Sequence, residues 1–342
     1  MEVKDKEKKK FDSKGGKKEA GGEGMKEERR LSEEEVFRRV LESVRSRKED
    51  EEAFEELRRI NRERKGEDKR RAERLGKKLI DECIQEKEEI SLERVVKLVL
   101  EGADVNVQDN NNGWTALMLA AEKEHEGIVE MLIKAGAKLD LQNKDGETAL
   151  MLAAEKEHEG IVEMLRKEGA DPFIVNNKGN TAYDLARNEE IKRIIKDEEK
   201  RKVKEIRESI RKWKEEGMKE EERPKGLETV FIWAALKGNT ELVKELIDLV
   251  DVNTKVSGNT ALMLAAEKEH EGIVEMLLKA GADPFIVNNN RESAYDLAGN
   301  KKIKKMLDNY MKRIKRVLRK MEKEEGLNKK EEKLMKVALK MA

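Results

Sequence analysis

Three segments of the chain, residues 115–132, 148–165 and 260–277, have the same sequence, TALMLAAEKEHEGIVEML. The first two segments begin 33 residues apart. A fixed period of this length is typical of proteins built from stacked helical repeats. One such unit cannot cover its own apolar face, so each unit has to pack on its neighbours. We therefore expect an all-α solenoid.

Each unit reads as two short helices. The first is rich in alanine, which lets neighbouring helices approach closely, and the second has an apolar stripe at i, i+1, i+3 and i+4. In the first copy this stripe consists of Ile128, Val129, Met131 and Leu132. A glycine follows the apolar helix of several units, where a C-terminal cap needs positive φ. These glycines are Gly102, Gly136, Gly169 and Gly281.

The unit resembles the ankyrin repeat. The matching residues are Gly113-Trp114-Thr115-Ala116-Leu117, Leu119-Ala120-Ala121, His125, Ile128-Val129 and Leu132. Degenerate and partial units extend the resemblance over residues 76–197 and 229–308. It implies helix pairs joined by β-turn fingers, with residues 139–146 and 173–179 as two of the fingers. It also implies a non-catalytic scaffold that binds partner proteins.

Two further sequences occur twice. GADPFIVNN at 169–177 returns at 281–289, and AYDLA at 182–186 returns at 294–298, both with a shift of 112 residues. AYDLA ends a half-unit, residues 179–186 in the first copy, that looks like the closing repeat of an ankyrin array, and a long charged helix follows it in each copy. The sequence thus predicts a duplicated module of ankyrin units, closing half-unit and long helix.

These patterns divide the chain into two short arrays with long flanking charged helices. Residues 1–30 are rich in Lys, Glu and Gly and too poor in aliphatic side chains to offset their ordering entropy, so we expect a disordered tail. The capping box formed by Ser32 and Glu35 opens the next segment. We expect a helical N-terminal extension at 31–75, ankyrin array 1 at 76–197, a helical connector at 198–228, ankyrin array 2 at 229–308, and C-terminal helices at 309–342.

Composition excludes several classes of protein. Lys+Arg and Asp+Glu are both 75, so the summed charge favours neither nucleic acid nor membrane. The N-terminal sequence lacks the apolar region of a signal peptide, and no run of 18 apolar residues occurs. Cys83 is the single cysteine, so the chain has no disulfide framework or cysteine metal cage of its own. We expect a soluble, cytoplasmic protein.

The residues that usually carry catalysis or bind metal are few. His125, His158 and His270 occupy one repeat position. Stacked helices lie ~8–10 Å apart, so equivalent histidines cannot share a zinc ion that needs bonds of ~2 Å, and a structural role between the two helices is favoured. Cys83 fits a buried small residue better than a nucleophile. The sequence has no phosphate-loop, nucleophile-elbow or dinucleotide motif. We expect no catalytic site, no metal and no cofactor.

Residues 301–321 form a predicted basic helix, with ten cations against the single acid Asp308. Its apolar residues repeat at spacings of four and three, as in a helix–helix seam. The helix fits a solvated outer face of the array best. The alternatives are binding to nucleic acid, another polyanion, an anionic membrane or a groove-type partner, and self-association through the seam at 303–321. The seam residues are Ile303, Leu307, Tyr310, Ile314, Val317 and Met321.

Candidate partner-binding residues follow from the ankyrin resemblance, because that family usually meets partners with finger tips and exposed positions of the first helix. At the fingers they are Trp114, Glu147, Asn180 and Asn259, and on the helices Glu122, Lys123, Glu155, Lys156, Glu267 and Lys268. An exposed tryptophan at a finger is a typical interface hot spot. Packing of Trp114 on the neighbouring unit is an equally weighted alternative.

The chain departs from the family pattern in the loop between the two helices. Family units have glycine before the loop histidine, whereas this chain has Glu124, Glu157 and Glu269. Glutamate is strained at a position that needs positive φ. Either the strain is retained, or the loop has shifted so that the glycine two residues after each histidine makes the turn.

Overall fold

The computed structural model describes residues 30–84 and 91–322. Within these ranges the chain forms helices and no strand, with two isolated β-bridges in the fingers. The all-α prediction is confirmed. All but the last residue of the predicted tail at 1–30, and the part of the predicted C-terminal helices beyond residue 322, lie outside the described residues.

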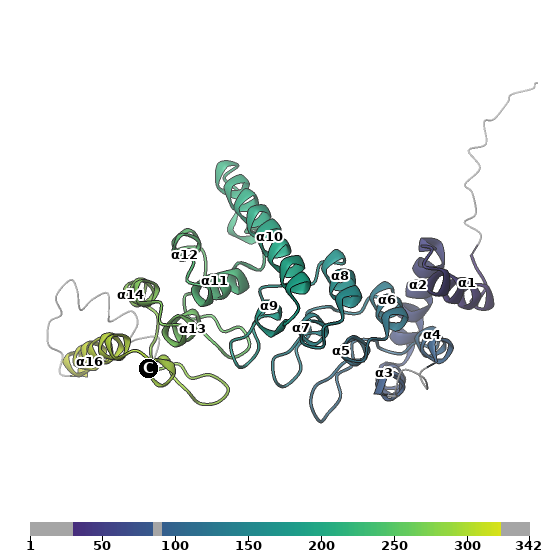
Figure 1. Ribbon diagram of the computed structural model, residues 1–342, viewed down its shortest axis with the longest axis horizontal. Coiled ribbons are helices and arrows are strands. Elements are labelled where there is room, and N and C mark those ends of the chain that lie inside the picture. The colour runs from purple at the N-terminus through teal and green to yellow at the C-terminus, as the bar shows by residue number, and fades with distance from the viewer. Residues whose placement is uncertain (1–29, 85–90, 323–342) are drawn as a thin grey trace, which may run out of the picture.

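Helix pairs follow one another along the chain and stack into a row (Figure 1). In the first array the pairs are α3 (Lys69–Ile84) with α4 (Leu92–Leu100), α5 (Ala116–Glu122) with α6 (Glu126–Lys134), α7 (Ala149–Glu155) with α8 (Glu159–Lys167), and α9 (Ala182–Leu185) with α10 (Glu189–Glu215). In the second they are α11 (Leu227–Leu236) with α12 (Thr240–Leu246), α13 (Ala261–Glu267) with α14 (Glu271–Lys279), and α15 (Ala294–Leu297) with α16 (Lys301–Glu322). A short 3₁₀ turn, Glu220–Glu222, precedes α11.

Threonine sets the start of each alanine-rich helix. The hydroxyl of Thr115 accepts a hydrogen bond from the Met118 N–H at 3.2 Å, and Thr148 and Thr260 make the same bond. This satisfies one N–H that the helix itself leaves unpaired. All six residues from Ala116 to Ala121 are buried, because small side chains let α5 lie against both neighbours.

The N-terminal hairpin, α1 (Glu33–Ser46) and α2 (Glu51–Glu67), lies across the side of the array formed by the second helices, where α1 contacts α4 and α6. Asn61 donates from Nδ2 to the carbonyls of Val99 and Ala103 at 2.6 and 2.9 Å, and Arg64 donates to the Leu100 carbonyl at 2.8 Å. These carbonyls lie in the last turn of α4 and just beyond it, where helical hydrogen bonding ends. The hairpin therefore both covers the array and caps one of its helices.

The two arrays form one continuous stack. The ring of Trp233 in α11 meets the ring of Phe173 edge-on, with centroids 4.8 Å apart. The Trp233 Nε1–H donates to Glu199 of α10 at 3.2 Å. Lys237, which ends α11, donates to Asp184 of α9 at 2.7 Å. The first closing half-unit is thus covered by the second array.

Four predicted domain boundaries fall inside helices. The divisions at 75/76, 197/198, 228/229 and 308/309 lie within α3, α10, α11 and α16. Each of these helices has buried side chains on both sides of the division, so it packs as one unit.

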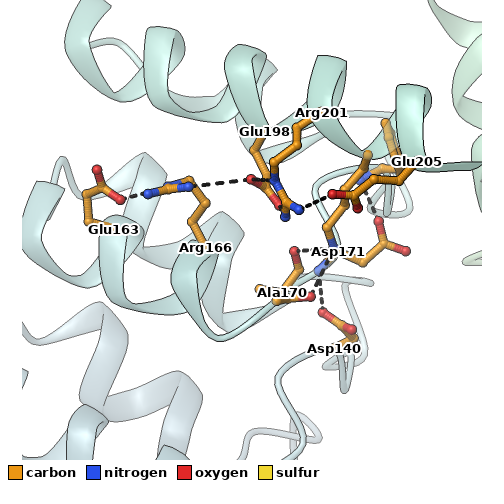
Figure 2. Close-up of polar contacts among 11 residues, drawn as sticks. Asp140, Glu163, Arg166, Ala170, Asp171, Glu198, Arg201 and Glu205 are labelled. Atoms are coloured by element: carbon orange, nitrogen blue, oxygen red, sulfur yellow. Dashed lines mark hydrogen bonds and ion pairs between the residues drawn. The ribbon is translucent and has the colours of Figure 1, made fainter.

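A buried carboxylate fixes α10 to the first array (Figure 2). Glu198 is buried and accepts from Arg201 Nε at 3.0 Å, while Arg166 of α8 approaches it to 3.5 Å. Burial alone would raise the pKa of Glu198, but the hydrogen bond from Arg201 and the positive charges of Arg201, Lys202 and Arg166 together outweigh it and lower the pKa. Lys202 adds two bonds at 3.0 Å to the carbonyls of Gly169 and Ala170. The ion pair between Arg166 and Glu198, together with the two Lys202 bonds, therefore holds α10 against the first array.

The apolar seam of α16 is buried within the chain. Its side chains at Ile303, Leu307, Ile314 and Val317 belong to the core of the second array. The hypothesis of self-association through 303–321 is therefore wrong for this fold, because the array already covers these side chains.

Candidate partner-binding surface

The fingers project on one side of the row of helices (Figure 1). Each is closed by a pair of residues that face each other across the turn. In one finger, the Asn143 N–H donates to the Glu147 carbonyl at 3.0 Å and the Glu147 N–H donates to Asn143 Oδ1 at 2.8 Å. In the next, Asn176 and Asn180 make the same two bonds at 2.9 Å. The fingers therefore have a fixed and repeated backbone.

Neighbouring fingers are also bonded to each other. The Lys144 N–H donates to the Asn112 carbonyl at 2.8 Å, and the Asn177 N–H donates to the Asp145 carbonyl at 2.9 Å. Gln142 crosses to the second array, with its Nε2 2.6 Å from the Ser257 hydroxyl. The fingers thus form a band that runs from the first array into the second.

Trp114 occupies the position of Glu147 in its own finger, which is one residue longer. Its N–H donates to Asp109 Oδ2 at 2.8 Å, and its side chain is half-buried against the core of the first array. Burial tends to raise the pKa of Asp109, but the backbone N–H groups around it hold the pKa below its usual value. Trp114 therefore packs on the array with one part of its ring and presents the other part to solvent.

Glu147 and Asn180 are half-buried at their fingers, whereas Asn259 is different. The Asn259 side chain is 2% exposed and points its Nδ2 towards the Asn176 carbonyl at 3.5 Å. Its prediction as a partner-contacting residue is wrong, because the finger that carries it lies at the junction of the two arrays. Asn259 stands in the same Gly-Asn-Thr-Ala sequence as Asn180, but the first array lies against its side chain and buries it.

The candidate residues on the first helices lie at the helix ends. Only the last residue of α5, Glu122, and the following Lys123 are accessible, since the rest of the helix is buried. Lys156 of the next unit approaches Glu122 at 3.4 Å, and the two residues line a shallow depression with Lys123, Glu124 and His158. Glu155 occupies the same position in α7 as Glu122 in α5.

The corresponding pair in α13 is internal to one unit. Lys268 donates from Nζ to Glu267 Oε1 at 3.0 Å, and Lys268 is exposed while Glu267 is half-buried. Lys237 fills this position in α11 and bonds to Asp184. The helix ends therefore form a second row of charged side chains beside the fingers.

The histidines have the structural role that their spacing favours. Each precedes the second helix of its unit, at the N-cap of α6, α8 and α14. The Nε2 of His158 lies 2.9 Å from the Glu122 carbonyl, and that of His270 lies 2.9 Å from the Leu236 carbonyl. Each of these two histidines thus joins its unit to the end of the preceding first helix.

The described residues contain no cluster of three or more His, Cys, Asp or Glu side chains that could hold a metal ion. Cys83 is fully buried in α3, and burial raises the pKa of its thiol to about 12. A thiol with such a pKa is not a nucleophile near neutral pH. None of the described helices is long and apolar enough to span a membrane.

The three loop glutamates retain the strained backbone. Glu124, Glu157 and Glu269 have φ of 61°, 65° and 62°, and the glycines two residues after each histidine lie inside helices. Gly238 takes the same position in the pair α11–α12, with φ of 72°. The loop therefore keeps the left-handed conformation that glycine has at Gly238, with glutamate in place of glycine.

The tips of the fingers contain exposed residues that are not among the predicted contact residues. These are Asn111, Asn112, Lys144, Asp145 and Lys178. Each immediately precedes a turn glycine, or stands one residue further back. That position relative to Gly113, Gly146 and Gly179 is the signal that would have found them, since the apex of a tight turn faces solvent.

The cations of α16 face outwards, opposite the buried seam. Lys301, Lys305, Lys312, Arg316 and Arg319 are exposed. Lys312 pairs with Asp308 at 2.5 Å. In the part of the chain that the structure describes, no ion pair joins Lys305, Arg316 or Arg319 to an acid. The outer face of this helix is therefore basic.

Comparison with known proteins agrees with this architecture. A family model for ankyrin repeats, in three copies, matches residues 87–176 and 203–288, just over half of the chain. Oxysterol-binding protein-related protein 1 of Mus musculus is 44% identical over 215 residues, which are 59% of this chain and 20% of that protein. The Rattus norvegicus protein of the same name is 44% identical over 202 residues, 58% of this chain and 19% of that protein.

A shorter match is ankyrin repeat domain-containing protein 40 of Homo sapiens, 42% identical over 50 residues, which are 15% of this chain and 14% of that protein. The chain spans about a fifth of the length of the two oxysterol-binding protein-related proteins. The repeat period, the helix pairs with their fingers and the family match lead to one conclusion. The chain belongs to the ankyrin-repeat family.

Proposed function

We propose that the protein is a non-catalytic scaffold that holds a partner protein against its band of fingers and the adjoining helix ends. Ankyrin repeats are in general protein-interaction modules. The observation that carries the proposal is the hydrogen-bonded band itself, in which exposed tips such as Lys144, Asp145 and Lys178 stand on a fixed backbone. A rigid surface loses little conformational entropy when a partner binds.

The proposed contact surface has two parts. The finger part consists of the tips together with Trp114, Glu147 and Asn180. The helix-end part consists of Glu122, Lys123, Glu155, Lys156, Glu267 and Lys268. Trp114 is the expected anchor, because its half-buried ring is held in place before a partner arrives. The single cysteine, Cys83, is a free and buried thiol, as is common in proteins of reducing compartments. We therefore propose a cytoplasmic location.

Site-specific photo-crosslinking in cells tests this proposal. A photoreactive amino acid is placed at residue 144 or 178 on the fingers, and at 167 or 279 on the second helices as matched exposed controls. We expect the same partner to be crosslinked from both finger positions and from neither control. Crosslinks from the control positions alone would contradict the proposal.

A second candidate function rests on the basic outer face of α16, which suits a polyanion, nucleic acid or an anionic membrane surface. Its support is the row of Lys305, Arg316 and Arg319, which have no acidic partner among the described residues. Binding to phosphate groups would weaken steeply with salt. Replacing these three cations with glutamate should then abolish binding of the full chain to duplex nucleic acid and to anionic vesicles, and leave binding through the fingers unchanged.

A further inference from the structure

The two closing half-units have nearly the same sequence but different surroundings. In the first, Phe173 is 2% and Val175 0% exposed, and both belong to the core that α11 and α13 complete. Their equivalents in the second copy are Phe285, which is half-buried, and Val287, which is 41% exposed. The same side chains that bind a further helix pair in one copy are thus uncovered in the other.

A lysine-binding site is repeated as well. Asp184 accepts from the Thr181 N–H at 3.0 Å and from Lys237 Nζ at 2.7 Å, and the same lysine lies 5.3 Å from the centre of the Tyr183 ring. Asp296 accepts from the Ser293 N–H at 2.8 Å in the same cap geometry, next to Tyr295. No lysine in the described part of the chain donates to Asp296. One copy of this site is filled from α11. In the other, Lys304 of α16 lies over the Tyr295 ring and its charge acts on Asp296 without a hydrogen bond.

The end face is defined by the equivalents of the first-copy residues that meet Trp233, Lys237 or the core around them. They are Phe285, Val287, Tyr295, Asp296 and Met311, all at least partly exposed. Tyr295 is 37% exposed. Lys304 and Lys315 lie over the rings of Tyr295 and Phe285, at 5.6 and 5.8 Å from their centres. These lysines are attracted to the rings that they cover in part. They give the end face a basic rim around its apolar side chains.

We propose that the end face binds a helix pair of the ankyrin type from another protein, in the way that the first closing half-unit binds α11–α12. The internal copy specifies the chemistry of the partner helix. It needs a large aromatic side chain to meet Phe285, as Trp233 meets Phe173. It also needs a lysine at its C-terminal end to reach Asp296, as Lys237 reaches Asp184. The end face lies at the end of the stack, where Phe285 and Val287 belong to the last finger. Its proposed occupant continues the stack and does not cross the finger tips, so the inference goes beyond the proposed function.

Arg291 restricts what can bind. It stands where Gly179 stands in the first copy, and it keeps the left-handed backbone with φ of 65°. A Cβ on Gly179 would lie 3.0 Å from the Leu264 side chain of α13. An element placed like α13 would therefore meet the Arg291 side chain, whereas the site of α11 remains open. The end face accepts one helix pair rather than a whole further array.

The test uses the full chain and a labelled synthetic peptide of residues 224–250 as the probe, since this peptide carries the α11–α12 sequence. Fluorescence anisotropy measures its dissociation constant. We expect micromolar binding, weakened at least about tenfold by Val287→Glu in the full chain. Because Val287 is exposed, this variant keeps its fold, which its thermal melting checks. The peptide could instead displace the chain's own α11 from the first closing half-unit. Loss of binding with Val287→Glu excludes this alternative, because Val287 lies on the end face.

A charge exchange makes the test specific. Lys237→Glu in the peptide should weaken binding about fivefold, and Asp296→Lys in the full chain should restore it. Failure of the peptide to bind, or equal binding to the Val287→Glu chain, overturns the proposal. Binding that appears only after residues 323–342 are removed assigns the end face to the chain's own tail. Dimerisation that Val287→Glu abolishes, measured by sedimentation, assigns it to a second copy. Either result also overturns the proposal.

Discussion

The two closing half-units compare one sequence in two environments. AYDLA and its preceding finger occur at 169–186 and again at 281–298, and both copies form the same short helix and cap. In the first copy the next helix pair buries Phe173 and Val175, whereas in the second Val287 faces solvent. Local structure therefore follows from the local sequence, and burial follows from the neighbour. Each prediction below changes a matched pair of residues in the two copies or tests a position that they share.

The largest difference should come from the two phenylalanines. Phe173→Ala removes a buried ring and its contact with Trp233, so we expect a loss of about 3–4 kcal/mol in the free energy of unfolding. Phe285→Ala should cost about 1 kcal/mol, since that ring is half-buried. Urea unfolding measures both. Equal losses would show that the two half-units have the same surroundings.

The junction should also respond to pH through Glu199. Burial raises the pKa of Glu199 to about 7, and its ordinary value applies when the chain is unfolded. Folding thus favours the protonated form, so this contribution to stability is full below about pH 4.5 and is lost as pH rises through 7. Lys237, Asp184 and Lys196 are the other charged groups that influence it.

Glu199→Gln keeps an acceptor for the Trp233 N–H and removes the titration. The variant should therefore gain about 2 kcal/mol relative to the unaltered chain between pH 5 and pH 8. Unfolding by urea at both pH values gives this difference. Met311 occupies the equivalent position in the second copy and does not titrate, so Met311→Gln serves as the control with no such gain. A pH-independent difference for Glu199→Gln would contradict the prediction.

The aspartates provide a smaller contrast. Asp184→Asn keeps the helix cap and removes the charge that holds Lys237, a pair whose side chains are 31% and 25% exposed. We expect a loss of about 1 kcal/mol, reduced by solvent screening. Asp296→Asn should change stability by less than about 0.3 kcal/mol, because Lys304 acts on it only through its charge and no lysine donates to it. A double-mutant cycle with Lys237→Met isolates the pair.

The smallest effects concern positive φ. Arg291→Gly, and Glu124→Gly, Glu157→Gly or Glu269→Gly in the loops, should each stabilise the chain by about 0.5–1 kcal/mol. Gly179 and Gly238 show that glycine already fills the equivalent positions elsewhere in the chain. Thermal melting of the single variants and of the combined variant measures the gain. A lowered melting temperature would mean that these side chains make contacts worth more than the strain.

Much of the fold could be predicted because each unit repeats its own signals. The period of 33 residues, the threonine caps and the stripe from Ile128 to Leu132 specify the helix pairs, and the buried seam of α16 follows from its spacing. The junction could not be predicted in this way. The pair α11–α12 has no finger before it, so no motif shows that Trp233 lies on Phe173.

The candidate surface was predicted less completely for the same reason. Asn259 has the sequence context of Asn180, yet the neighbouring array buries it. The exposed tips, by contrast, are marked locally by the turn glycines and were available from the sequence. Exposure that depends on a turn can be read locally, whereas exposure that depends on a long-range contact needs the three-dimensional structure.

The three identical copies of TALMLAAEKEHEGIVEML have a consequence for how the chain folds. Eighteen residues at 115–132, 148–165 and 260–277 present the same surface, so nothing inside them records which neighbour each should take. The correct order of the units in the stack depends on the fingers and on residues outside the copies. One such residue is Arg47, which pairs with Glu126 at 2.7 Å. At high concentration, a copy from one molecule satisfies the contacts of a copy in another, and exchange of units between molecules competes with correct folding.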